Sequence, residues 1–136
     1  MKRTLIMFLF VFYSMVSFAP STNTIYISAA EPYKETTYDA LVEAIYKVES
    51  QCNPFAYNAL ENAIGGLQIR QCRIEHYNRL TGKNYTLQEM YDLSKAKEVF
   101  LYFAKGKTYE QAAKNWNGSG PMTELYWEKV KKLIAV

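Results

Sequence analysis

The sequence predicts an all-α domain with a buried central helix and little or no sheet. From residue 31 onward, hydrophobic residues recur at the spacing of a helix, and short breaks with glycine or proline separate these segments. The alternation of apolar and polar residues that is typical of a half-buried strand is hard to find in the same part of the chain. With 136 residues, of which 49% are hydrophobic, the chain has room for one domain with a core.

The first two predicted helices flank a loop that contains Gly65 and Gly66. The first helix covers residues 37–50 and should end before Pro54, because the residue that precedes a proline avoids the helical region. The second helix ends before Gly82. The inward face of the first consists of Tyr38, Leu41, Val42, Ile45 and Val48. The stripe of the second consists of Ile69, Cys72, His76, Tyr77 and Leu80.

Capping patterns begin the next two predicted helices. Thr86 with Glu89 forms the pattern of a capping box and starts a short helix. Ser94 can cap the helix that follows, which stops near Gly106. Because this helix is apolar around most of its circumference, we expect it to be the buried central helix.

The last two predicted helices are separated by the turn at residues 117–121. Thr108 with Gln111 repeats the capping pattern, and the helix that it begins carries Trp116 on its apolar stripe. That position favours core packing over stacking on a sugar ring. The final helix covers residues 123–134, and its inward face consists of Tyr126, Val130, Leu133 and Ile134.

The N-terminus has the layout of a secretory signal peptide. Lys2 and Arg3 precede an apolar run, and the small residues at 28–30 fit a cleavage site. The run is shorter than the roughly 20 residues that span a bilayer, although an uncleaved anchor remains the alternative. We therefore assign residues 1–30 to a signal peptide or N-terminal anchor and residues 31–136 to the domain. The prediction is an exported protein, periplasmic or secreted, which meets a membrane only through an uncleaved N-terminus.

Charge and aromatic content indicate the class of partner. Loss of residues 1–30 removes Lys2 and Arg3 but no acidic residue, so the net charge falls from +3 to +1. A chain with so little excess positive charge lacks the basic surface that neutralises phosphates, which argues against a nucleic-acid partner. The 12 tyrosines and two tryptophans supply flat apolar faces with polar edges, which suit stacking on sugars.

Cys52 and Cys72 are the only cysteines in the chain. An even count in an exported protein favours a disulfide between them. Two buried thiols or one reactive cysteine are the alternatives. We expect no metal site, since His76 is the only histidine and the sequence has no close pair of cysteines and no acidic calcium loop.

Glu49 is a charged residue within the apolar stripe of the first predicted helix. It falls within the apolar stripe, whereas Glu43 falls on the opposite face. A carboxyl group among core positions is a violation that tends to mark function. Burial and the negative end of the helix dipole both disfavour the ionised form, so the pKa of Glu49 should be raised towards the range of a proton donor. The alternative is a glutamate at a helix end that reaches into solvent.

Four motifs follow one another along the chain. They are Glu-Ser at 49–50 with Asn-Pro-x-Ala at 53–56, Asn-Ala-Ile-Gly-Gly-Leu-Gln-Ile at 62–69, Ala-Ala-Lys-Asn-Trp-Asn-Gly at 112–118 and Tyr-Trp-Glu-Lys-Val at 126–130. Together they resemble the motifs of the soluble lytic transglycosylase family, in the same order and over about residues 38–134. The sequence departs from the family at Asn62, where glycine is usual, and at Trp116 and Gly118, where tyrosine and alanine are usual.

The resemblance implies a lysozyme-like fold and a reaction that needs no cofactor. Glu49 would protonate the glycosidic oxygen between N-acetylmuramic acid and N-acetylglucosamine in peptidoglycan. It would then accept a proton from the muramyl C6 hydroxyl, which closes onto C1 and gives a 1,6-anhydro product without water. The resemblance also implies a substrate site that includes Ser50, Gly65, Gln68, Asn117 and Tyr126, in which Tyr126 could orient Glu49 or the sugar.

Three other functions stay open at this point. A hydrolytic lysozyme pairs two carboxylates, so hydrolysis is favoured if Glu61 faces Glu49 across the cleft. A protein of the same fold could bind glycans without cleaving them. A cell-wall peptidase could use Cys52 as nucleophile and His76 as base, although such enzymes need strands that this sequence does not predict. The resemblance is compatible with three settings: wall remodelling, a secretion or conjugation apparatus, and a phage.

Overall fold

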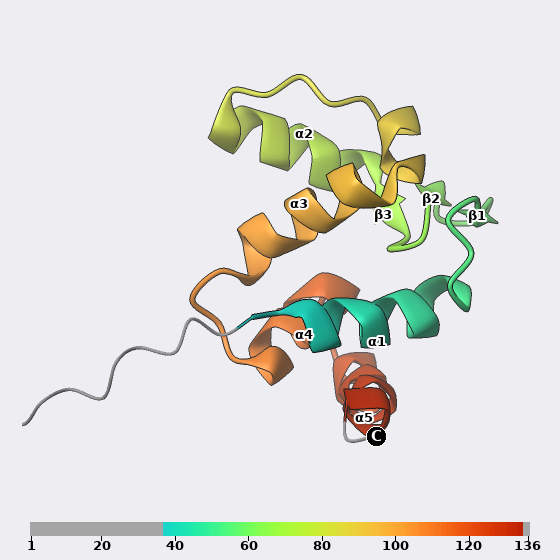
Figure 1. The fold of residues 1–136 in the computed structure, drawn as a ribbon, viewed down its shortest axis with the longest axis vertical. Coiled ribbons are helices and arrows are strands. Elements are labelled where there is room, and N and C mark those ends of the chain that lie inside the picture. Colours follow the sequence, from blue (N-terminus) through green and yellow to red (C-terminus); the bar gives the residue numbers. More distant parts are fainter. Residues whose placement is uncertain (1–36, 135–136) are drawn as a thin grey trace, which may run out of the picture. The chain divides into compact units, whose positions relative to one another are not determined.

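The computed structural model describes residues 37–134 of the chain, and the predicted signal peptide at 1–30 lies outside them. The described part contains five α-helices, one 3₁₀ helix and three short strands, in the order α1, β1, β2, β3, α2, η1, α3, α4, α5 (Figure 1). The prediction of a mostly helical domain is confirmed. Within these residues, each helix is too short or too polar to cross a membrane.

Helix α1, Asp39–Ser50, is the first helix that the sequence predicts. Leu41 and Ile45 have no exposed surface, so the predicted apolar face lies in the core. The helix ends in two consecutive left-handed residues, Gln51 at φ 55° and Cys52 at φ 64°. The amide of Cys52 donates to the carbonyl of Tyr46 at 3.3 Å, which closes the last turn. This ending fixes the direction in which the chain leaves the helix beside Glu49.

A small antiparallel sheet replaces most of the predicted loop. Its strands are β1 (Tyr57–Asn58), β2 (Ala63–Ile64) and β3 (Ile69–Arg70), paired in the order β1-β2-β3. Ile64 lies opposite both Tyr57 and Ile69. Strands of two residues are too short to produce an alternating pattern, so the sequence did not reveal them. Ile69 therefore belongs to a strand and not, as predicted, to the second helix.

Helix α2, Gln71–Thr81, buries less surface than predicted. Within it only Ile74 and Tyr77 are buried, while Cys72, His76 and Leu80 are exposed. The predicted stripe was wrong at these three positions because α2 contacts the core mainly through Ile74 and Tyr77. The exposed His76 ring lies 5.3 Å from the ring of Phe103.

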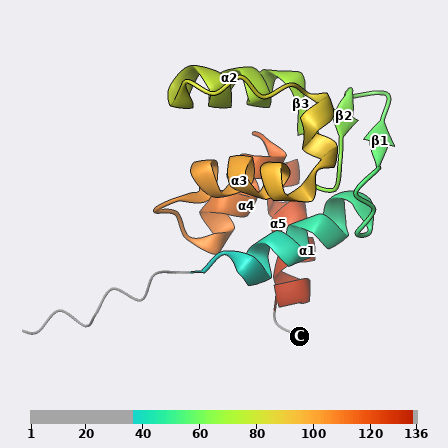
Figure 2. The same cartoon turned by 45° about the horizontal axis from the view of Figure 1, so that its top comes forward.

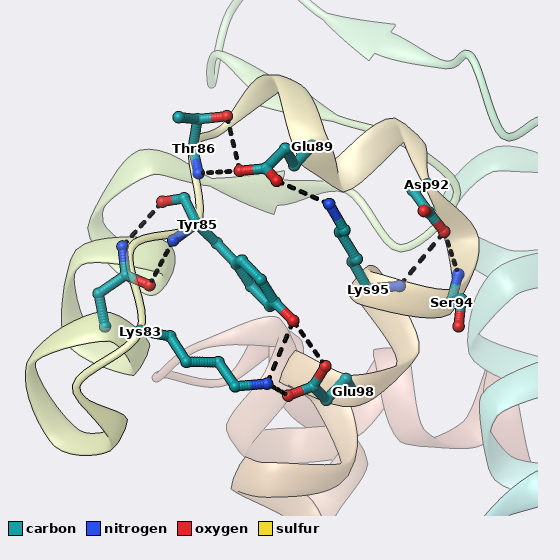
Figure 3. A network of polar contacts seen from close by, with 9 residues as sticks. Lys83, Tyr85, Thr86, Glu89, Asp92, Ser94, Lys95 and Glu98 are labelled. Atoms are coloured by element: carbon teal, nitrogen blue, oxygen red, sulfur yellow. Dashed lines mark hydrogen bonds and ion pairs between the residues drawn. The ribbon is translucent and has the colours of Figure 1, made fainter.

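The region between α2 and α3 is held by polar contacts (Figure 3). In η1, Gln88–Tyr91, the carboxylate of Glu89 accepts from the amide of Thr86 at 2.7 Å and from its hydroxyl at 3.1 Å. Only half of the predicted capping box is thus present, on a single 3₁₀ turn, because no side chain caps the amides of η1. Helix α3, Leu93–Ala104, is capped by Asp92 and not by Ser94, since the Asp92 side chain accepts from the amides of Ser94 and Lys95.

Helix α3 is buried on one face and not around most of its circumference. Val99 and Phe100 are in the core, whereas Leu101 and Tyr102 are 39% and 42% exposed. The apolar character of the helix overstated its burial, because exposed apolar residues are common on protein surfaces. On its polar side, Glu98 accepts hydrogen bonds from the hydroxyls of Tyr77 and Tyr85 and pairs with Lys83.

The contacts of Glu98 with Lys83, Tyr77 and Tyr85 should make the free energy of unfolding depend on pH in acid. The hydrogen bonds from Lys83, Tyr77 and Tyr85 lower the pKa of Glu98 from 4.5 to about 2. Ionised Glu98 therefore stabilises the fold above pH 4.5, and this stabilisation is lost as the pH falls towards 2. Because the Glu98 side chain is 42% exposed and its charge is screened by water, Glu98→Gln should lower the free energy of unfolding by only about 1 kcal/mol at pH 7. Urea unfolding at several pH values measures the difference, which should shrink in acid.

Glu128→Gln is the matched control for that change. Glu128 is exposed and lies 3.9 Å from Lys131, so its loss should alter the unfolding midpoint little at any pH. An equal loss of stability in the two variants would contradict the role given to Glu98.

The two C-terminal helices pack against α1. Helix α4, Tyr109–Asn117, begins with the predicted capping box of Thr108 and Gln111, which is confirmed. Helix α5, Met122–Ile134, packs against both α4 and α1 (Figure 2). Tyr126 and Val130 are buried as predicted, whereas Leu133 is 41% exposed. The arrangement places Tyr126 beside the C-terminal end of α1.

Candidate functional site

A cleft of about 210 Å³ opens beside the last turn of α1. The β1-β2 hairpin, β3, the first turn of α2 and the end of α4 form its other walls. The residues that line it are Glu49, Asn58, Glu61, Gln68, Ile69, Arg70, Cys72, Arg73, Trp116, Asn117 and Gly118. Of the residues that the sequence predicted for the site, the cleft brings together Glu49, Gln68 and Asn117.

Glu49 is partly buried in the wall of this cleft. Burial raises the pKa of its carboxyl group, because removal from water disfavours the charge. The hydrogen bond from Tyr126 lowers the same pKa, but burial outweighs it. The rise predicted from the sequence is confirmed. A raised pKa is the direction that a proton donor requires.

Tyr126 binds the Glu49 side chain through a hydrogen bond and does not itself line the cleft. Its hydroxyl donates to Oε1 of Glu49 at 2.7 Å, and the tyrosine is only 8% exposed. Burial, followed by the negative charge of Glu49, raises the pKa of Tyr126, so the phenol stays protonated and acts as the donor. Tyr126 is absent from the cleft lining, which makes it a positioning residue for Glu49 and not a contact for a ligand.

Gln68 and Asn117 present amide groups to the cleft from two different elements. Gln68 has a left-handed backbone at φ 49° just before β3, and its Nε2 donates to the carbonyl of Gly65 at 2.9 Å. Asn117 is the last residue of α4. Both side chains can exchange hydrogen bonds with hydroxyl or acetamido groups of a ligand.

Ser50 and Gly65 lie outside the cleft lining. The Ser50 hydroxyl donates to the carbonyl of Tyr46 at 3.1 Å within its own helix. Gly65 has φ +77°, and a Cβ on it would lie 2.1 Å from the carbonyl oxygen of Met90. These two residues shape the backbone around the site and are not placed to touch a ligand.

Gly65→Ala should therefore destabilise the fold by about 2–4 kcal/mol, through the strained φ and the collision with Met90. Gly82→Ala is a sharp control, because Gly82 has a similar φ of +73° and nothing within 4 Å of a Cβ. It should cost only about 1 kcal/mol. Thermal or urea unfolding of both variants measures the difference, and equal losses would show that the contact with Met90 is unimportant.

The structure does not contain the predicted disulfide between Cys52 and Cys72. Cys52 and Cys72 are both free and exposed. Cys52 follows α1 in a left-handed turn, while Cys72 lies in the first turn of α2, and the two elements hold the thiols apart. Cys72 lines the cleft, whereas neither Cys52 nor His76 does, so the cleft does not bring together the nucleophile and base of a peptidase. Among residues 37–134, no three His, Cys, Asp or Glu side chains gather as metal ligands.

Two arginines in the cleft were missed by the sequence reasoning. Arg70 forms an ion pair of 3.0 Å with Glu61, the second carboxylate of the cleft. The guanidinium of Arg73 lies 4.8 Å from the ring centre of Trp116. Arg70 directly follows the motif at 62–69 and Arg73 lies three residues further on, and this proximity was the signal that could have pointed to them.

Trp116 is mainly a core residue, as its stripe position predicted. It is 8% exposed, its ring lies 5.0 Å from that of Phe100, and its Nε1 donates to the carbonyl of Leu67 at 3.2 Å. That hydrogen bond ties the end of α4 to the loop before β3. It thereby fixes one wall of the cleft relative to another.

Comparison with known proteins adds no relative. No family model matches the sequence, and no significant match was found among curated proteins or solved structures.

Proposed function

We propose that this domain cleaves the glycan strands of bacterial peptidoglycan, with Glu49 as its acid and base. The observation that carries the proposal is a partly buried carboxyl group with a raised pKa, in the wall of a cleft and held by Tyr126. The order of the four motifs supports the same function and a lysozyme-like fold. Two amides, from Gln68 and Asn117, are available for the polar groups of the sugars.

The chemistry needs the Glu49 proton at the start and the Glu49 carboxylate afterwards. Tyr126 donates to Oε1, so Oε2 is the oxygen that carries the proton of the neutral acid. Transfer of this proton to the oxygen between N-acetylmuramic acid and N-acetylglucosamine breaks the bond to C1. The carboxylate then takes the proton of the muramyl C6 hydroxyl, whose oxygen bonds to C1 and gives the 1,6-anhydro end.

Hydrolysis of the same bond is the second candidate, and the position of Glu61 favours it. Glu61 lines the same cleft as Glu49, and its negative charge contributes to the raised pKa of Glu49. A second carboxylate beside the scissile bond is the usual arrangement in glycosidases that use water. Its ion pair with Arg70 keeps Glu61 in a defined position at the cleft wall.

Mass spectrometry of the products separates these functions. Purified peptidoglycan is incubated with the native protein, Glu49→Gln and Glu61→Gln. We expect anhydro ends from the native protein and from Glu61→Gln, and no products from Glu49→Gln. Reducing ends that depend on Glu61 would establish the hydrolase instead. Binding without any product would leave a glycan-binding protein and would overturn the proposal.

The sequence of residues 1–30 supports a proposal about location. We propose that the chain is exported to the periplasm or secreted, where peptidoglycan is accessible. Fractionation of cells that express the full chain, followed by N-terminal sequencing of the protein, tests this. Recovery of the uncleaved chain from the cytoplasm alone would contradict it.

A further inference from the structure

Arg73 is an unusual residue for the wall of a small cleft. Its guanidinium lies 5.2 Å from the ring centre of Phe103 and 4.8 Å from that of Trp116. Its Nη2 donates to the carbonyl oxygens of Asn115 and Trp116 at the end of α4, each at 3.2 Å. The contacts with rings and carbonyls hold the planar group in one orientation, with its charge at the cleft.

The positive charge of Arg73 has no carboxylate partner within residues 37–134. The ion pairs of this part of the chain involve other cations. Arg73 is partly buried, and this burial lowers the pKa of its guanidinium. A cation in such surroundings is normally paired, because desolvation without a counter-charge is unfavourable.

The hydrogen bonds that cap the C-terminal end of α4 use only one of the three nitrogens of the Arg73 guanidinium. Both bonds to the α4 carbonyls come from Nη2, and neither Nε nor Nη1 forms a hydrogen bond within the described residues. No side-chain nitrogen or oxygen in this part of the chain is both fully buried and unpartnered. The N–H groups on Nε and Nη1 are therefore not fully buried, and Arg73 is one of the residues that line the cleft.

The remaining charges of the cleft leave an excess of one positive charge when Glu49 is protonated. Arg70 and Glu61 form an ion pair at 3.0 Å and cancel each other. In the proposed reaction Glu49 is neutral when the substrate enters the cleft, and its raised pKa is in the direction that this state requires. Arg73 is then the net charge of the site, and the complementary ligand is an anion.

We propose that Arg73 binds a carboxylate carried by the glycan substrate and so makes the domain selective for acid-bearing strands over neutral ones. The proposal rests on the proposed function, since the ligand enters the same cleft. In peptidoglycan, two groups supply this chemistry: the lactyl acid of a muramyl residue without a peptide, and the carboxylates of an attached peptide. Neutral polymers of N-acetylglucosamine have neither.

The test compares kcat/KM on three substrates: strands with peptides, strands stripped of peptides, and neutral N-acetylglucosamine oligomers. The native protein should prefer one or both acid-bearing strands over the neutral oligomer. Arg73→Gln should reduce this preference about tenfold, as expected for loss of one charge-assisted hydrogen bond. Arg73→Lys should retain part of the preference. The acid-bearing substrate whose kcat/KM falls most in Arg73→Gln identifies which carboxylate is bound.

Arg79→Gln is the matched control, because Arg79 is exposed on the same helix and is absent from the cleft lining. General damage to the fold would lower kcat/KM on all three substrates together and leave the preference unchanged, and an unchanged preference overturns the proposal. Calorimetric binding of the same glycans to the Glu49→Gln protein keeps the two proposals distinct. Selective binding that Arg73→Gln removes, without any cleavage by the native protein, would support the carboxylate site and contradict the proposed function.

Discussion

Replacement of Glu49 by glutamine is expected to lower the rate of glycan cleavage by about 10³-fold, within the range of general acid–base catalysis. Glutamine preserves the size of the side chain and can accept the hydrogen bond from Tyr126, but it has no acidic proton to transfer. The rate of release of soluble fragments from purified peptidoglycan measures the loss. Glu43→Gln is the matched control, since Glu43 lies on the exposed side of the same helix, paired with Lys97 at 2.8 Å.

The same substitution should raise the thermal stability at neutral pH. A carboxyl group whose pKa is raised by folding stabilises the protein below its ordinary pKa of 4.5, and this contribution is lost as the pH rises through the raised value. Ionisation of Glu49 is therefore less favourable in the folded protein than in the unfolded chain, and glutamine avoids this cost. Tm should rise in Glu49→Gln at pH 7, and the gain should disappear below pH 4.5. A gain of the same size in acid would contradict the burial of this charge.

Tyr126→Phe is expected to reduce kcat about tenfold and to shift the alkaline limb of the pH profile to higher pH. The hydrogen bond from Tyr126 lowers the pKa of Glu49, so its removal lets burial raise that pKa further. Because the acid must be protonated to act, activity should persist to a higher pH while the maximal rate falls through loss of positioning. Measurement of kcat across pH 4–9 is the readout.

A purely structural role of Tyr126 would lower kcat without moving the pH profile. Tyr109→Phe is the control, because the Tyr109 hydroxyl also donates a single hydrogen bond, to the carbonyl of Thr37 at 2.7 Å, and Tyr109 is absent from the cleft lining. That variant should keep the native profile. If the dependence of kcat on pH is the same in Tyr126→Phe as in the native protein, Tyr126 does not set the pKa of Glu49.

Stability and function conflict at the C-terminal end of α1. A hydrophobic residue at position 49 would satisfy the apolar stripe, whereas the carboxyl group there introduces a charge that burial disfavours. Tyr126 and the nearby Arg70 partly offset this cost by favouring the ionised form. The balance suits an acid that must hold its proton before the reaction and tolerate its loss afterwards.

Local patterns predicted the helices and the unusual carboxyl group well. The Thr108–Gln111 capping box and the ends of α1 and α4 depend on a few adjacent residues, and all are present. Glu49 could be found because a charged residue inside a helical stripe is visible from spacing alone. The predictions were wrong about exposure: Leu101, Leu80 and Leu133 are apolar, yet no element within residues 37–134 covers them.

By itself, the sequence determined the helical segments, the carboxyl group at the end of the first helix and the direction in which its pKa shifts, because each depends on neighbours within a few positions. Only the tertiary structure decided the partners of that carboxyl group. The hydrogen bond to Tyr126 joins residues 77 positions apart, and Arg73 meets Trp116 across 43 positions. It also decided that the two cysteines stay apart. Such contacts depend on how α1, α2, α4 and α5 pack, and no local spacing encodes that packing.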